Sequence, residues 1–260
     1  MASLSACPHW RRGSPIASVA AQVARIMGAP RTIAPSDSCG LRMEALLKET
    51  KQAFSYLRHA PFLKGSRWYL AGGTALALQV GHRQSVDLDF FFPGRTIRES
   101  ELERSLLESG EWKTTFRQSG TVYGTLFGSK ISFIAYPFFK PSRERMRCGN
   151  VAMLTPRDIA AMKIIAISQR GRKRDFVDLH WYCTHREPLS DTLSRAMQQY
   201  PGQEDNLPHI LKSLSYFADA ENDVMPKMFF QAPWKEVKSY FQIEAVVAAK
   251  KLLRILPDSR

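Results

Sequence analysis

Apolar and charged residues alternate most regularly between Val86 and Phe90. Val86, Leu88 and Phe90 alternate with Asp87 and Asp89. Because successive side chains of a strand point to opposite faces, this pattern predicts a strand with one apolar face and one acidic face. The apolar face should pack on a core, and the two carboxylates should project together from the other face.

The residues before this strand predict a compact strand–turn–helix unit. A short apolar strand is expected at 68–70, followed by a glycine turn at Gly72 and Gly73 and a small helix from Thr74. The turn would bring backbone N–H groups at a helix N-terminus close to the acidic strand.

The remaining pattern divides the chain into a half with strands and a half without them. Thr155, Pro156 and Asp158 form a strong helix-start signal at the division: a cap, a first-position proline and a first-turn acid. Before it we predict helices at 43–58 and 97–110 and strands at 111–118, 121–127 and 130–136. After it we predict helices at 156–169, 173–183, 189–200, 206–218 and 234–253. The sequence therefore predicts an α+β protein, with an α/β domain over 43–154 and a helical domain over 155–260.

Residues 1–42 differ from the rest in composition. They are rich in Ala, Ser, Pro and Arg and contain no acid before Asp37. Read literally, this composition resembles a transit peptide. We expect a disordered or non-native extension, with the functional start at Met43.

Composition and charge narrow the class of protein. The net charge of +13 favours acidic partners such as nucleic acid or nucleotides. The four cysteines show no CxxC or zinc spacing, which predicts reduced thiols in a cytoplasmic protein. No apolar run reaches the length of a membrane span, so no membrane association is expected.

Two carboxylates on one strand face repel each other unless a cation neutralises them. Magnesium or manganese prefers such oxygen ligands and leaves positions for water and phosphates. The Gly-Gly-Thr turn beside Asp87 and Asp89 suits a phosphate at a helix N-terminus. This combination is typical of phosphoryl or nucleotidyl transfer.

The motifs resemble those of a known family. GG[ST] followed by DxD, here GGTALALQVGHRQSVDLDFF, is similar to the nucleotidyltransferase fold of DNA polymerase beta. Together with the downstream stretch KIIAISQRGRKRDFVDL, it resembles the AbiEii/AbiGii-type nucleotidyltransferases, the toxins of bacterial type IV toxin–antitoxin systems. The resemblance covers about residues 43–250.

The resemblance implies a metal-dependent transferase with an NTP substrate. Asp87 and Asp89 would bind magnesium or manganese and act in catalysis, together with Lys163 and Asp175. The implied nucleotide-binding residues are Gly72, Gly73, Thr74, Arg83, Ser85, Lys163 and Arg170. The family fold usually carries a third carboxylate on a later strand, and the best-placed position here, Ser132, has a hydroxyl instead.

The residues of the second motif leave alternatives open. Lys163 and Arg170 lie two helical turns apart and share one face, so Lys163 is either a cation facing the triphosphate or a snorkelling lysine at a domain edge. Asp175 would position or deprotonate the attacking hydroxyl, while Asp178 would orient Arg170. The basic run Arg170 to Arg174 is either a solvated surface or a contact for an RNA backbone.

The leading hypothesis is therefore a nucleotidyltransferase toxin that transfers an NMP to an RNA, for example a tRNA, or to a protein hydroxyl. The implied partner is a cognate antitoxin. Two alternatives remain at this stage: a nucleotide- or RNA-binding module that has lost catalysis, and an antitoxin-like nucleotidyltransferase that modifies a partner toxin.

Overall fold

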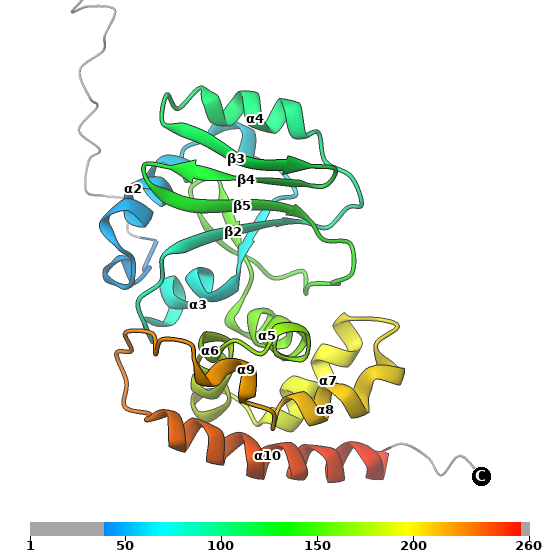
Figure 1. Cartoon of the computed structure of the whole chain (residues 1–260). Helices are drawn as coiled ribbons and strands as arrows, with labels where there is room; N and C mark the ends of the chain where they lie inside the picture. The colour runs from blue at the N-terminus through cyan, green and yellow to red at the C-terminus, as the bar shows by residue number, and fades with distance from the viewer. Residues whose placement is uncertain (1–38, 256–260) are drawn as a thin grey trace, which may run out of the picture. The chain divides into compact units, whose positions relative to one another are not determined.

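A seven-stranded mixed sheet forms the first half of the protein. The computed structural model describes residues 39–255, and these residues belong to one compact unit (Figure 1). In spatial order the strands are β3 (Trp112–Gln118), β4 (Thr121–Leu126), β5 (Ser129–Ala135), β2 (Asp87–Phe92), β1 (Tyr69–Ala71), β7 (Val151–Met153) and β6 (Met146–Cys148). β2 pairs in parallel with β5 and antiparallel with β1. The α+β class predicted from the sequence is confirmed, and the sheet of its α/β half is mixed.

Helices cover the two faces of the sheet unequally. α2 (Lys48–Leu57) packs on β2 and β5, and α4 (Glu99–Leu107) packs on β3 and β4. α3 (Gly72–Val80) lies on the opposite face, against β1 and β2. In Figure 1, α4 lies above the sheet and α3 lies below it, toward the helical half.

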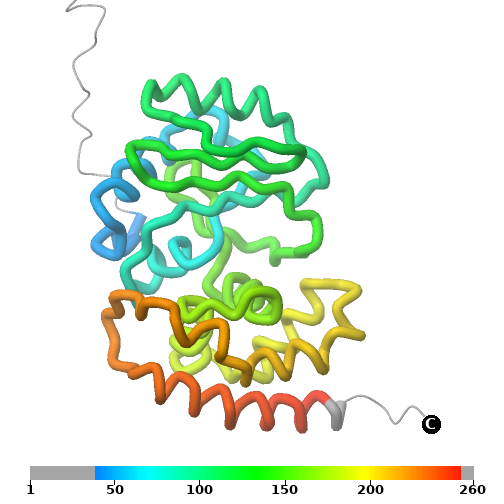
Figure 2. The backbone as a smooth tube through the Cα atoms, viewed as in Figure 1, coloured from blue at the N-terminus to red at the C-terminus, as the bar shows by residue number. Residues whose placement is uncertain are grey.

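The second half is helical, as predicted. Its helices are α5 (Pro156–Arg170), α6 (Lys173–His185), α7 (Leu189–Gln199), α8 (Leu207–Ser213), α9 (Ala218–Glu221) and α10 (Trp234–Ile255). Three short 3₁₀ helices complete the described chain: η1 (Met43–Ala45), η2 (Pro61–Leu63) and η3 (Glu204–Asn206). The start of α5 confirms the predicted cap, because Thr155 Oγ1 accepts a hydrogen bond from the Asp158 N–H. α5 packs on α3, α6 and α7, and α10 runs along α6, α7 and α8 (Figure 2).

The apolar face of β2 builds the centre of the core. Leu88 and Phe90 are buried, and the Phe90 ring stacks on Phe133 with their centroids 4.9 Å apart. Val86 is 42% exposed and precedes the strand, so the prediction that it faces the core was wrong. The alternation that matters therefore begins at Asp87.

The helix predicted over 43–58 is divided in two. Leu46 is extended, and it forms an isolated bridge with Ser85 next to β2. This bridge needs the extended backbone that a helix cannot provide, so η1 ends before it and α2 begins after it. A distant partner thus overrides the local helical pattern.

The N-terminal boundary predicted at residue 42 also changes. Residues 1–38, which hold most of the expected extension, lie outside the described residues. Cys39, however, forms a disulfide with Cys148 at the end of β6, and the Arg42 N–H donates to the Leu78 carbonyl. Residues 39–42 are therefore attached to the sheet, and the prediction of four reduced thiols was wrong.

Other local predictions missed short elements. β6 and β7 were not predicted, because three-residue strands carry too little pattern to read. The helix expected at 206–218 is replaced by α8, a turn and α9. Within residues 39–255, no helix combines the length and apolar character needed to cross a bilayer.

Candidate active site

The two aspartates of β2 lie on one face of the strand and form the centre of the site. Asp89 is half-buried and lies opposite Ser132 of β5 in the parallel register. Ser132 Oγ donates a hydrogen bond of 2.6 Å to Asp89 Oδ1. Burial raises the pKa of the Asp89 carboxyl, and the negative charge of Asp87 raises it further, although the Ser132 hydrogen bond opposes the shift. A cation between the carboxylates would relieve this cost.

Ser132 occupies the place where a third carboxylate would complete a metal site. The described residues contain no group of three His, Cys, Asp or Glu side chains arranged to hold a metal ion. The Asp87–Asp89 pair still fits a hard divalent cation, because magnesium commonly takes one or two protein carboxylates and fills its other positions with water and phosphate oxygens. The donor set therefore suits a metal that binds together with a nucleotide.

The N-terminus of α3 lies directly against Asp89. Gly72 has φ +70°, and a Cβ at this position would lie 2.9 Å from Asp89 Oδ2. Only glycine combines this backbone conformation with so close an approach. The first-turn N–H groups of a helix have no partner within the helix, so the backbone of Gly72 and Gly73 offers anion donors beside the carboxylates.

The hydroxyls of Thr74 and Ser85, two residues predicted to bind the nucleotide, form hydrogen bonds within the protein. Both are buried. Thr74 Oγ1 donates to the Asp87 carbonyl and lies 2.7 Å from Ser85 Oγ. These hydroxyls hold α3 and the chain before β2 together, so they fix the position of the acidic strand.

Arg83 is also turned inward. Its guanidinium forms a two-point contact with Asp178 of α6, with Nε–Oδ1 and Nη2–Oδ2 distances of 2.6 and 2.9 Å. A Cβ on Gly73 would lie 2.1 Å from Arg83 Nη2, so the guanidinium packs directly behind the α3 turn. Arg83 therefore supports the turn from behind, and Asp178 holds Arg83 rather than Arg170.

Lys163 links the two aspartates of α6. Its Nζ lies 2.6 Å from Asp175 Oδ1 and 2.6 Å from Asp178 Oδ2, and only 6% of its side chain is exposed. The Lys163 ammonium is thus buried and ion-paired, so a lysine that snorkels at a domain edge is not observed. Arg170 Nε lies 3.2 Å from Asp175 Oδ2, and its side chain is 54% exposed.

These contacts lower the pKa values of Asp175 and Asp178, the two aspartates of α6. Burial would raise the pKa of Asp178, but the charges of Arg83 and Lys163 and a hydrogen bond from His82 hold it well below its usual range. Burial likewise opposes ionisation of Asp175, but Lys163 and Arg170 lower the pKa of that carboxyl. Asp175 is completely buried and is ion-paired with two cations, Lys163 and Arg170.

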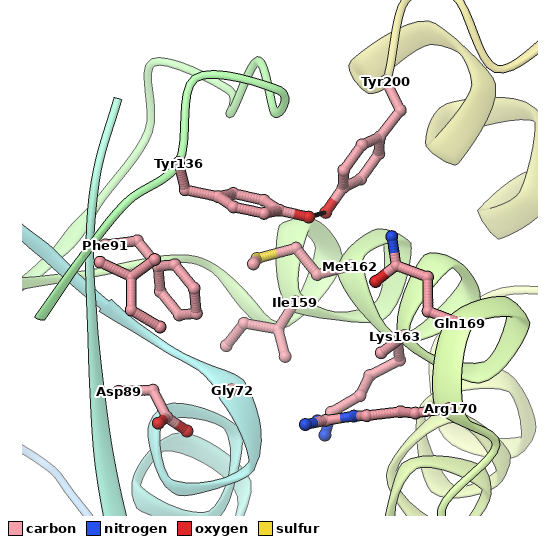
Figure 3. Close-up of a pocket in the computed structure, with 12 residues that line it drawn as sticks. Gly72, Asp89, Phe91, Tyr136, Ile159, Met162, Lys163, Gln169, Arg170 and Tyr200 are labelled. Atoms are coloured by element: carbon pink, nitrogen blue, oxygen red, sulfur yellow. Dashed lines mark hydrogen bonds between the residues drawn. The ribbon is translucent and has the colours of Figure 1, made fainter. Parts of the chain in front are cut away.

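A cavity of about 220 Å³ opens between the acidic strand and α5 (Figure 3). Asp89 and Gly72 lie on one side of it, and Lys163 and Arg170 approach from the other. Its remaining wall is largely apolar or aromatic and consists of Phe91, Ile134, Tyr136, Ile159, Met162, Ala166, Gln169 and Tyr200. The hydroxyls of Tyr136 and Tyr200 meet at 3.3 Å across its far end. The cavity thus joins an anion-binding end to an apolar end.

A model of the nucleotidyl transferase AbiEii toxin family, from type IV toxin–antitoxin systems, matches residues 55–119 and 137–245. The chain belongs to this AbiEii family. The matched residues include both aspartate motifs. They also include strands β1, β2, β3, β6 and β7 and helices α3 to α9.

The chain is also similar to individual proteins. The AbiEii-family chain is 34% identical over 181 residues to an uncharacterized protein of Aquifex aeolicus, covering 67% of this chain and 84% of that protein. The solved structure of MenT4, a nucleotidyltransferase toxin from Mycobacterium tuberculosis, shares the fold with a TM-score of 0.53 at 15% identity, covering 77% of this chain and 84% of MenT4. JHP933 from Helicobacter pylori has a TM-score of 0.45 at 18% identity, covering 80% and 95% of the two chains.

One charged residue at the site was missed. Arg174, in the first turn of α6, reaches across the chain so that its Nη1 lies 3.4 Å from Asp87 Oδ2. In the sequence, Arg174 is one residue of the basic run. Its partner Asp87 lies 87 residues away, and no local pattern predicts contacts over that distance. The side chains of Arg174 and Arg170 are both about half-exposed.

Proposed function

We propose that this AbiEii-family protein is a metal-dependent nucleotidyltransferase that moves an NMP from an NTP to a polymer hydroxyl. One observation carries the proposal: Asp87 and Asp89 share a strand face beside the N-terminus of α3, and Asp89 lines a cavity that also contains Arg170. A carboxylate, a backbone anion donor and a cation thus line one cavity, and Asp87 lies on the same strand face as Asp89.

Asp87 and Asp89 would hold the magnesium or manganese ion. When bound, such an ion neutralises charge on the phosphates and on the attacking and leaving oxygens. The N–H groups of Gly72 and Gly73 would bind phosphate oxygens. Arg170 would face the triphosphate, because its side chain is half-exposed at the cavity whereas the Lys163 ammonium is bonded to two aspartates.

The apolar end of the cavity suits the base and ribose. Aromatic faces such as those of Phe91 and Tyr136 accept a stacked base, and Met162 adapts its shape to the ligand. The acceptor hydroxyl oxygen would then form a bond to the α-phosphorus while the bond to the β-phosphate oxygen breaks. Pyrophosphate leaves, and the hydroxyl proton passes to water. In such transfers the protein acts mainly by positioning and by stabilising charge.

Lys163 and Asp175 would contribute indirectly. Lys163 joins Asp175 to Asp178, and Asp178 holds Arg83 behind the Gly73 turn. We therefore assign them the positioning of Arg170 and of the phosphate-binding turn. This assignment replaces the direct clamp and the general base that the sequence suggested.

The family description supports a role as the toxin of a type IV toxin–antitoxin pair, with a separately encoded antitoxin as partner. A cytoplasmic location, where NTPs and RNA are abundant, is part of the proposal. The Cys39–Cys148 disulfide is the observation that opposes it, because disulfides are rare in reducing compartments.

The test is to incubate the protein with each α-labelled NTP, magnesium and a cell lysate, and to identify the labelled polymer by RNase and protease digestion. Asp87→Asn and Asp89→Asn should each lower the rate at least about 100-fold, because each removes a ligand of the charge-stabilising group. A γ-labelled NTP should leave the polymer unlabelled, which separates nucleotidyl from phosphoryl transfer.

Ser132 favours one alternative, a nucleotide-binding module without transfer activity. Under that alternative the protein binds NTP with magnesium, but no polymer acquires label from any NTP. Near wild-type labelling by either aspartate variant would show that the metal assignment is wrong.

A further inference from the structure

A row of side chains crosses the sheet from the active site to its open edge. Asp89 lies opposite Ser132 of β5, Ser132 lies opposite Tyr123 of β4, and Tyr123 lies opposite Phe116 of β3. Residues opposite each other in adjacent strands point to the same face. With strands about 4.8 Å apart, the row extends roughly 14 Å from Asp89 to Phe116.

A second row runs beside the first and carries positive charge. Asp87 lies opposite Lys130, Lys130 opposite Thr125, and Thr125 opposite Lys113. Lys113 and Lys130 are both exposed, and within residues 39–255 neither has a carboxylate within ion-pair distance. Arg117 of the same edge strand is instead ion-paired with Glu103 of α4 on the covered side of the sheet.

The two rows border a hollow that contains the aspartates. It has a volume of about 460 Å³ and is lined by residues of both rows, from Asp87 and Asp89 to Tyr123 and Lys130. Phe116 and Tyr123 are 44% and 38% exposed, with ring centroids 5.6 Å apart and planes inclined by 32°. α2 and α4 pack on the opposite face, and β3 is exposed along almost its whole length. We call this surface of β3, β4 and β5 the open sheet face.

Two adjacent exposed rings and two unpaired lysines match single-stranded nucleic acid. Base stacking on aromatic side chains is largely indifferent to sequence, and lysines follow the phosphates. A duplex would hide the base faces that the rings need. A neutral or basic peptide would not be attracted to the cations along the row, and the net charge of +13 favours a polyanion.

We propose that the open sheet face binds the single-stranded 3′ end of a nucleic acid acceptor and delivers its terminal hydroxyl to Asp89. The proposal rests on the proposed function, because it gives that reaction its acceptor. Phe116 and Tyr123 stack on bases, and Lys113 and Lys130 contact phosphates. At a stacked spacing of about 3.4 Å per nucleotide, the 14 Å row accommodates roughly four nucleotides.

The test measures binding of 5′-labelled 12-nucleotide single-stranded RNA, its DNA counterpart and a blunt RNA duplex by fluorescence anisotropy. Phe116→Leu and Tyr123→Leu should each weaken single-strand binding about tenfold, because each removes one stacking surface. Phe116→Trp should retain binding. Lys113→Gln and Lys130→Gln should each reduce the slope of log affinity against log salt by about 0.7.

Matched controls address a merely structural or nonspecific effect. Tyr216→Leu removes an exposed aromatic ring in the helical half, and Arg117→Gln removes a cation of the same strand on the covered side. Both should leave single-strand affinity within about twofold. The unfolding midpoint should be unchanged in Phe116→Leu and Tyr123→Leu, because both rings are exposed. The affinity for NTP alone should also be unchanged, because neither ring lines the nucleotide cavity.

The outcomes separate this proposal from the proposed function. If either single strand binds in a way that depends on the two rings, but no label is transferred, the open sheet face binds nucleic acid as proposed. The proposed transferase activity would then be wrong. If both leucine variants still transfer label to RNA and bind it with unchanged affinity, the role of the open sheet face is wrong. The proposed transferase activity would then still stand. Equal affinity for duplex and single strand, or labelling of protein alone, also overturns it. A difference between the RNA and DNA arms identifies which 3′ end is preferred.

Discussion

Two pairs of aspartates, similar in the sequence, lie in opposite environments. Asp87 and Asp89 are separated by one residue on a strand, are partly exposed and border a cavity. Asp175 and Asp178 are separated by two residues on a helix, are completely buried and are bonded to three cations. The first pair has charge left to neutralise, while the second pair has none.

The difference lies in how many cations each pair already contacts. Half-exposed Arg174 lies 3.4 Å from Asp87, and among the described residues Asp89 has the Ser132 hydroxyl as its hydrogen-bond partner. Asp178 alone receives Arg83 and Lys163 at 2.6 Å each. A pair with unsatisfied charge attracts a metal or a nucleotide, whereas a satisfied pair fixes the elements around it. The spacing of acids in a sequence therefore does not distinguish a reactive pair from a structural one.

The largest expected effect is on stability, from removing the charge of the buried pair. Asp178→Asn leaves Arg83 and Lys163 buried without their shared counter-charge, which should cost about 3–5 kcal/mol of unfolding free energy. Asp89→Asn, the matched change in the exposed pair, should alter stability by less than about 1 kcal/mol. Chemical denaturation of both variants measures the difference, and equal losses would remove the distinction between the pairs.

Lys163→Met tests whether the lysine belongs to the buried network or to the nucleotide site. Arg170 still neutralises Asp175 and Arg83 still neutralises Asp178, so the loss should be smaller, about 1–3 kcal/mol. The methionine keeps most of the apolar stem, which isolates the effect of the charge. A stable variant with strongly weakened NTP affinity would instead return Lys163 to direct nucleotide contact.

The smallest effect concerns pH. Burial, reinforced by the charges of Arg83 and Lys163, lowers the pKa of His82 despite its contact with Asp178. The unfolded chain therefore takes up a proton below about pH 6.5 that the folded chain refuses, so stability falls as the pH drops through that value. Between pH 7 and 5.5 this should cost about 1 kcal/mol.

His82→Gln is the control for the pH effect, because glutamine can donate to Asp178 but does not titrate. Denaturation midpoints at several pH values should show a shallower decline for the variant than for the native protein. Parallel declines would indicate that His82 is protonated in the folded state, and that the Asp178 cluster accepts a third positive charge.

Local patterns alone determined much of the candidate site. Asp87 and Asp89 share a face because the two-residue period of a strand is a property of the backbone itself. The cap at Thr155 follows from three neighbouring residues. The family resemblance, by contrast, pointed to Ser132 as the position of a third carboxylate, and the Ser132 hydroxyl lies beside Asp89.

Tertiary structure decided the role of each charge, because burial and partners depend on residues far apart in the sequence. Arg83 is separated from Asp178 by 95 residues, Arg174 from Asp87 by 87, and Cys39 from Cys148 by 109. No local pattern records these meetings. They turned the expected cleft lysine and nucleotide-binding arginine into a buried network, and they attached residue 39 to the sheet. The sequence alone thus identifies which side chains carry charge. Only packing determines which of those charges remain available to a ligand, because a charge that a buried partner neutralises no longer attracts one.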